Sequence, residues 1–270
     1  MPQPAIYRVF ALCQGWRECD ASLLLYLADA GRKARLPYFF WLLEPAGGGP
    51  PEGGAQPEGS RKPILVDTGF LEGQCRARYA QFEGYRRQRD LLAPFKVEPR
   101  DVETVILSHL HWDHFGAARL YPEARFHLQR TELGFWRGPA GEHAFLRHYL
   151  ADLGDAAWLE EEGRLNLLDG DAEIAPGLTV HLVGGHTPGL QVARVRTEEG
   201  WAVLAVDAAY VYRSFESMIP PGIHVRVDEA LSALDRVKEL ADRPTLIFPG
   251  HDAETLARYS EMAPGVRRLA

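Results

Sequence analysis

The segment Ser108–His114 constrains this chain most strongly, because it places three histidines and an aspartate within six consecutive positions. The apolar run Val105–Leu107 precedes it and predicts a short buried strand, while Phe115–Leu120 predicts the start of a helix. The cluster is therefore expected on a strand-to-helix loop, where side chains on a rigid scaffold can converge on one point. Imidazole nitrogens and carboxylate oxygens suit zinc and related divalent ions, so the segment predicts a metal site.

Three further ligand-type residues each follow an apolar strand much later in the chain, and they are His186, Asp207 and His251. Strand ends gather at one rim of a sheet sandwich, so these side chains are expected beside the first cluster. The combined set exceeds the four ligands of a tetrahedral zinc site and predicts two divalent ions. The predicted metal ligands are His109, His111, Asp113, His114, His186, Asp207 and His251.

The composition is that of an ordinary globular protein, with 46% hydrophobic and 25% charged residues, and 270 residues could form one large domain or two small ones. We expect a single domain, because strands closely flank the Gly/Pro-rich segment and it is therefore not a linker between domains. A net charge of -7 gives no general attraction to nucleic acid. No apolar run approaches the ~20 residues of a membrane span, and the first residues lack signal-peptide features. A cytoplasmic location is therefore expected.

The order of apolar segments predicts an α/β (α+β) chain with strands and helices in each half. That order fits an αββα sandwich, in which two mixed sheets are flanked by helices. Residues 45–62 are rich in glycine and proline between two close strands, Pro37–Leu43 and Ile64–Val66, which predicts a flexible hairpin tip. Helices are also predicted at 79–92, 131–136, 142–159 and 228–241, whereas 21–28 could be helix or strand.

The pattern His-Xaa-His-Xaa-Asp-His at 109–114 resembles the signature of the metallo-β-lactamase-fold hydrolases. Other segments narrow the resemblance to the quorum-quenching N-acyl homoserine lactonases. These segments are Pro63–Gly69, Gln129–Glu132, Gly185–Gly189, Asp207–Tyr210 and Gly250–Asp252. Glyoxalase-II-like thioesterases share the histidine cluster, and lactonases for other small lactones are also similar, so both remain alternatives.

The resemblance implies a division of the ligands between two ions, with Asp207 bridging them. It assigns His109, His111 and His186 to the first ion, and Asp113, His114 and His251 to the second. It also implies that Asp67 supports the metal loop from behind, although an aspartate before a glycine could simply cap a turn. Tyr210 is implied to hydrogen-bond the substrate carbonyl or leaving group, and Asp113 is a candidate proton carrier.

The implied activity is hydrolysis of a carboxylic ester, in which a metal-bridging hydroxide opens the ring of an N-acyl homoserine lactone. Zinc is the expected metal, and cobalt, manganese or iron would accept the same ligands. The expected partner is a small-molecule lactone, and the resemblance allows a homodimer. The acyl-chain preference stays open, because Trp112 and the long segment 45–62 depart from the pattern of some lactonases.

Overall fold

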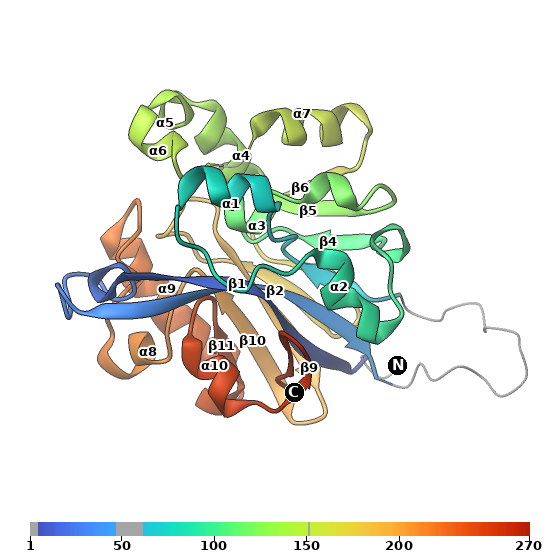
Figure 1. The fold of residues 1–270 in the computed structure, drawn as a ribbon. Coiled ribbons are helices and arrows are strands. Elements are labelled where there is room, and N and C mark those ends of the chain that lie inside the picture. Colours follow the sequence, from blue (N-terminus) through green and yellow to red (C-terminus); the bar gives the residue numbers. More distant parts are fainter. Residues whose placement is uncertain (1–4, 47–61, 151) are drawn as a thin grey trace, which may run out of the picture.

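The computed structural model describes residues 5–46, 62–150 and 152–270, and it contains two β-sheets. The larger sheet has eight strands in the order β12-β13-β1-β2-β3-β4-β5-β6, and the smaller has five in the order β11-β10-β9-β8-β7. Helices α4 to α7 lie on one side of the sheets and α8 and α10 on the other (Figure 1). The arrangement confirms the predicted αββα sandwich of two mixed sheets with flanking helices.

The strands of the larger sheet are β1 (Tyr7–Asp20), β2 (Lys33–Pro45), β3 (Ile64–Val66), β4 (Thr104–Ile106), β5 (Arg125–Gln129), β6 (Leu165–Leu168), β12 (Glu261–Ala263) and β13 (Val266–Arg268). Those of the smaller sheet are β7 (Ala172–Ala175), β8 (Leu178–Leu182), β9 (Gln191–Thr197), β10 (Gly200–Val206) and β11 (Ile247–Pro249). The helices are α1 (Glu72–Arg78), α2 (Gln88–Leu92), α3 (Trp112–Phe115), α4 (Arg130–Arg137), α5 (Pro139–Glu142), α6 (Ala144–Arg147), α7 (Leu153–Glu161), α8 (Arg213–Ser217), α9 (Val227–Leu240) and α10 (Ala253–Arg258).

Strand β1 shows how the sequence builds two apolar layers. Its side chains alternate between the two faces of the sheet, as the period of a strand requires. Val9 and Ala11 join the buried cluster that includes β9 and β10, whereas Phe10 and Leu12 join the cluster on the opposite, helix-covered face. Because both faces of the larger sheet are covered, its central strands are apolar throughout and the strand ends are rigidly placed.

Parallel pairing brings the ends of neighbouring strands to one rim of the sandwich. Val66 of β3 pairs with Ile106 of β4, so the chain leaves both strands side by side at Asp67 and Leu107. In the smaller sheet the end of β10 pairs in parallel with the end of β11. The residues that directly follow these strands therefore meet at the same rim.

Three helix predictions were wrong in extent. The helix expected to start within Phe115–Leu120 is instead the short α3, which ends at Phe115 and carries Asp113 and His114. The segment predicted as one helix at 79–92 is divided, because α1 ends at Arg78 and α2 begins at Gln88. Between these helices, Glu83 and Trp16 of β1 are joined by two backbone hydrogen bonds of 2.9 and 3.0 Å. These bonds hold the chain around Glu83 against β1, so it is not helical. The segment predicted as a helix at 142–159 is likewise divided, into the end of α5, α6 and α7.

The Gly/Pro-rich segment predicted as a flexible tip at 45–62 lies outside the described residues, apart from Pro45, Ala46 and Lys62. Residues 21–28 form a short 3-10 helix (Ala21–Leu23) followed by turns, which is neither of the two predicted alternatives. Within the described part of the chain, no helix is long and apolar enough to cross a membrane.

Candidate metal centre

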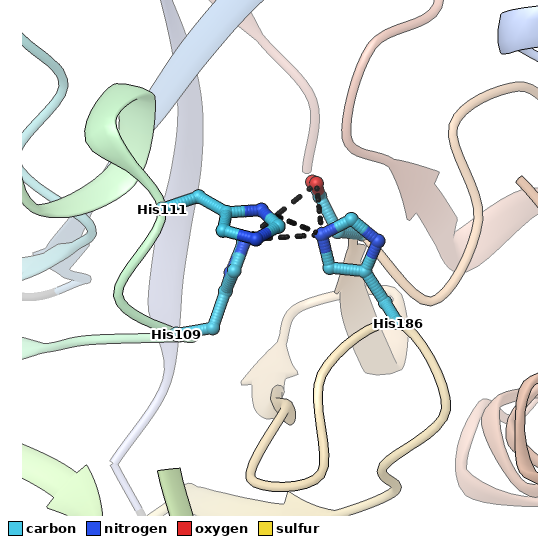
Figure 2. Close-up of side chains that lie close together, drawn as sticks. His109, His111 and His186 are labelled. Atoms are coloured by element: carbon cyan, nitrogen blue, oxygen red, sulfur yellow. Dashed lines mark hydrogen bonds and ion pairs between the residues drawn. The ribbon is translucent and has the colours of Figure 1, made fainter. Parts of the chain in front are cut away.

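Three imidazoles converge at the rim of the sandwich, from the loop after β4 and the loop after β8 (Figure 2). The Nε2 atom of His186 lies 3.2 Å from Nε2 of His109 and 2.9 Å from Nδ1 of His111. All three side chains are buried. Together with Asp207 they form a group whose ligand atoms all lie within 4.8 Å of one another.

A second group of ligand atoms, drawn from Asp113, His114 and His251, is equally compact, with all of them within 4.8 Å of one another. His114 and His251 are buried, while the side chain of Asp113 is 12% exposed at the edge of the group. Carboxylate oxygen Oδ2 of Asp113 lies 3.5 Å from His114 Nε2 and 3.8 Å from His251 Nε2.

Asp207 lies between the two groups and directs one carboxylate oxygen toward each. Its Oδ2 atom lies 3.1 Å from His186 Nε2 and 3.7 Å from His109 Nε2. Its Oδ1 atom lies 3.1 Å from His251 Nε2 and 3.3 Å from His114 Nε2. The structure thus brings together all seven residues that the sequence predicted as ligands, in the division that the resemblance implied.

The donor set fits divalent metal ions. Two of its buried atoms, His114 Nε2 and Asp207 Oδ1, have no hydrogen-bond partner in the described chain, although unpaired buried polar atoms are costly. Each group offers three or four nitrogen and oxygen ligands, the number and type that zinc sites use. The two buried clusters are therefore suited to hold two ions.

The charges of these side chains also suit a bound cation. Burial and the neighbouring imidazoles lower the pKa of His109 well below its usual value, which keeps its ring neutral and able to bind a metal. Burial opposes ionisation of Asp207, but His114 and His251 outweigh it and hold its pKa well below the ordinary range. The centre thus contains a buried negative charge that a divalent cation would neutralise.

Polar partners outside the two groups fix the orientation of the imidazoles. Asp67 Oδ2 contacts His114 Nδ1 at 2.7 Å and accepts a 2.9 Å hydrogen bond from Ser108 Oγ. The Nδ1 atoms of His186 and His251 lie 2.7 Å from the carbonyl oxygens of Ile223 and Pro37. Such contacts place the proton on Nδ1 and leave Nε2 free to bind a metal. Asp67 therefore lies behind the metal loop, in the position expected of a residue that supports His114. Its backbone has a φ of 63°, in the left-handed region.

Glycine at position 250 permits the close approach of β11 to Asp207. A Cβ atom at Gly250 would lie 2.6 Å from the carbonyl oxygen of Val206 and 3.0 Å from Asp207 Oδ1. Any larger residue would displace the Asp207 carboxylate or the strand that carries it. The adjacent His251 is anchored by a 2.9 Å hydrogen bond from its backbone N–H to the carbonyl of Tyr210.

Glu132 is a positioning residue that sequence reasoning missed. Its fully buried Oε1 accepts hydrogen bonds from the backbone N–H of Leu110 at 3.0 Å and from Trp136 Nε1 at 2.7 Å. Its Oε2 accepts from the backbone N–H of Gly189 at 3.1 Å. One carboxylate thus joins the loop of His109 and His111 to the loop of His186. The sequence contained one sign of this role, because Glu132 lies four residues before the buried Trp136 and therefore on the same face of the helix.

A narrow pocket opens above the centre. Tyr210, which is 4% exposed, forms part of its wall, and its ring packs against His186 and His251 with centroid distances of 5.8 and 4.8 Å. Burial and the nearby Asp207 raise the pKa of Tyr210 well above its usual value, so its hydroxyl keeps its proton. Further aromatic side chains line the pocket, and they are Tyr38, Tyr79, Trp112 and Tyr149.

Comparison with known proteins defines the class of the molecule. Residues 58–251 match the sequence profile of the metallo-beta-lactamase superfamily. With the αββα sandwich and the two ligand groups at its rim, this match shows that the chain belongs to that superfamily.

Its relatives include proteins named N-acyl homoserine lactonase. The one from Bacillus thuringiensis is 30% identical over 257 residues, which cover 87% of this chain and 89% of the relative. N-acyl homoserine lactonase AttM of Agrobacterium fabrum is 26% identical over 266 residues, covering 94% and 96% of the two chains.

Solved structures similar to this chain also include N-acyl homoserine lactone hydrolases. The crystal structure of a quorum-quenching N-acyl homoserine lactone lactonase superimposes with a TM-score of 0.72 at 26% identity, covering 97% of this chain and 98% of that one. The structure of an N-acyl homoserine lactone hydrolase with the product N-hexanoyl-L-homoserine at its catalytic metal centre gives 0.71 at 25% identity, covering 95% and 98%.

Proposed function

We propose that this protein is a dinuclear-metal hydrolase that opens the lactone ring of N-acyl homoserine lactones. The observation that carries the proposal is the position of Asp207, whose two oxygens face two separate groups of ligand atoms. The pocket above those groups and the relatives named as lactonases support the same substrate class.

In the proposed enzyme His109, His111 and His186 would hold one ion, Asp113, His114 and His251 would hold the other, and Asp207 would serve both. Ions held there would supply Lewis acidity toward an ester carbonyl and make a water nucleophilic near neutral pH. The paired carboxylates and imidazoles fix the two positions, so little reorganisation is needed when the ester is attacked.

Tyr210 supplies a hydrogen-bond donor to the reacting ester. Its hydroxyl stays protonated in the buried pocket, and its ring contacts one histidine from each group. It can therefore donate to the carbonyl oxygen or to the departing ring oxygen. Asp113 is the most exposed of the seven ligands' side chains and can pass a proton from solvent to the leaving oxygen.

The aromatic walls of the pocket would bind the acyl chain and exclude water from the ester. Trp112 packs against Phe70 and Tyr38, with ring centroids 4.7 and 5.6 Å apart, so it presents a rigid surface. The backbone N–H of Trp112 donates a 2.8 Å hydrogen bond to the carbonyl of Tyr149, another residue of the wall, so the two aromatic residues are held next to each other.

The test is acid release from lactones by the purified protein, with its metal content measured in the same sample. We expect about two ions per chain, rapid opening of N-hexanoyl and N-decanoyl homoserine lactone, and loss of activity after chelation. If the protein binds two ions and hydrolyses a glutathione thioester but opens no lactone, the lactonase proposal is wrong and the protein is a thioesterase.

A further inference from the structure

Arg17 is a cation in the wall of the pocket above the metal centre, and nothing in the proposed reaction uses it so far. It lies on β1 opposite Leu36 of β2, and both residues line the pocket. Among the described residues that line this pocket, it is the only arginine or lysine. Its side chain is half-buried.

Two aromatic neighbours hold the Arg17 guanidinium in one orientation. Its Nε donates a 2.8 Å hydrogen bond to the hydroxyl of Tyr38. The guanidinium also stacks over the ring of Tyr79, 4.2 Å from the ring centroid. A guanidinium fixed on two sides is preorganised, so little side-chain entropy is lost when it binds a ligand.

No carboxylate within the described part of the chain forms an ion pair with Arg17, although Glu18 beside it pairs with Lys33. Among the residues that the structure describes, the one other acceptor for Arg17 besides Tyr38 is the carbonyl of Glu18, at 3.3 Å. An arginine has five N–H donors, so these two hydrogen bonds leave three for another acceptor. A half-buried cation without a counter-charge is costly unless an acceptor binds it.

A single tyrosine separates this guanidinium from the metal centre. Tyr38 accepts from Arg17 through its hydroxyl, while its ring lies with its centroid 5.4 Å from that of the predicted ligand His251. A substrate whose ester carbon lies at the centre can therefore present an oxygen to Arg17 only if that oxygen is a few bonds from the ester.

We propose that Arg17 is a specificity-determining residue, which selects lactones that carry a hydrogen-bond acceptor oxygen on the acyl side of the ring. The inference rests on the proposed lactonase function and names a feature of its substrate. The acceptor is either the amide carbonyl next to the ring or an oxo group one position further along the acyl chain. A γ-lactone with a plain alkyl chain offers neither oxygen.

The test compares kcat/KM for three lactones of equal chain length: an alkyl γ-lactone, an N-acyl homoserine lactone and its 3-oxo derivative. In Arg17→Met the preference of the enzyme for the amide lactone over the alkyl lactone should fall about tenfold to hundredfold, as expected for a lost charge-assisted hydrogen bond. A fall restricted to the preference for the 3-oxo derivative over the amide lactone would assign the oxo group as the acceptor.

Arg35→Met is the matched control. Arg35 lies on the same hairpin and stacks on Trp16 at 4.2 Å, but it does not line the pocket, so both preferences should be unchanged. An equal loss of activity on all three lactones in Arg17→Met would mean that Arg17 only supports the wall, and would overturn the inference. Unchanged preferences would overturn it too, while leaving the lactonase function intact. A wild-type protein that opens no lactone would refute the proposed function and this inference with it.

Discussion

Glu132→Gln is the most informative single change, because it keeps the shape of the side chain while altering one contact between the two metal loops. The oxygen of glutamine can still accept from Leu110 and Trp136, as Oε1 does in the wild type. Its NH₂ group then faces the backbone N–H of Gly189, which now donates to Oε2 at 3.1 Å. Two donors cannot pair, so a buried N–H loses its acceptor.

The expected cost follows from that one lost bond. A hydrogen bond to a charged acceptor contributes about 1.5–3 kcal/mol, and a buried donor left unpaired costs a similar amount. A Cβ atom at Gly189 would lie 2.3 Å from the backbone nitrogen of Glu132, so the two backbones are in contact and the loop can relieve the donor–donor contact only by moving away from α4. We therefore expect the free energy of unfolding of the metal-free protein to fall by about 2 kcal/mol.

The same change should weaken the first metal site selectively, because the displaced loop carries His186. Loss of a partner outside the ligands typically weakens metal binding about tenfold to hundredfold. The measurements are urea unfolding of the metal-free protein and competition for zinc or cobalt with a chelator of known affinity. Glu161→Gln, an exposed position at the end of α7, is the control. Wild-type unfolding and wild-type affinity at both sites would refute the positioning role of Glu132.

Four further outcomes are expected. Asp207→Asn should reduce turnover by orders of magnitude and weaken loading of both ions, whereas near-normal activity with two ions per chain would disprove the bridging role. Tyr210→Phe should lower kcat about a hundredfold with metal content unchanged, and metal loss would show that it has another role. Asp67→Ala should lower the affinity for the second ion about tenfold to hundredfold in a chelator competition, since His114 would lose its partner. Chelation should lower the melting temperature of the wild type reversibly, and an unaltered melting curve would argue against bound metal.

The ligand set could be predicted because its signal is local. The segment Ser108–His114 concentrates four ligand types after an apolar strand, and His186, Asp207 and His251 each follow an apolar strand as well. Parallel pairing places the end of β10, before Asp207, beside the end of β11, before His251, whereas His186 follows β8, whose neighbours are antiparallel. The predicted roles of these residues in binding metal stay predictions until metal content is measured.

Other features depend on contacts between distant residues, which the sequence pattern does not contain. The helix predicted at 79–92 fails because Glu83 pairs with Trp16, more than sixty positions away. The role of Glu132 depends on where Leu110 and Gly189 lie in space, which the motif Gln129–Glu132 does not reveal. Arg17 gave no signal at all, because a single arginine at the end of an apolar strand is common on protein surfaces.

The wide spacing of the ligands along the chain sets an order for assembly during synthesis. The first group needs Asp207, so it cannot form until β10 has left the ribosome, and the second group needs His251, after β11. Strand β13, which closes the larger sheet beside β1, follows later still. A nascent chain therefore cannot acquire the complete centre before most of its length is available to fold. Metal uptake in such a chain would report folding as far as β11, before β12 and β13 complete the larger sheet, and a stalled product shorter than 251 residues would lack His251 of the second group.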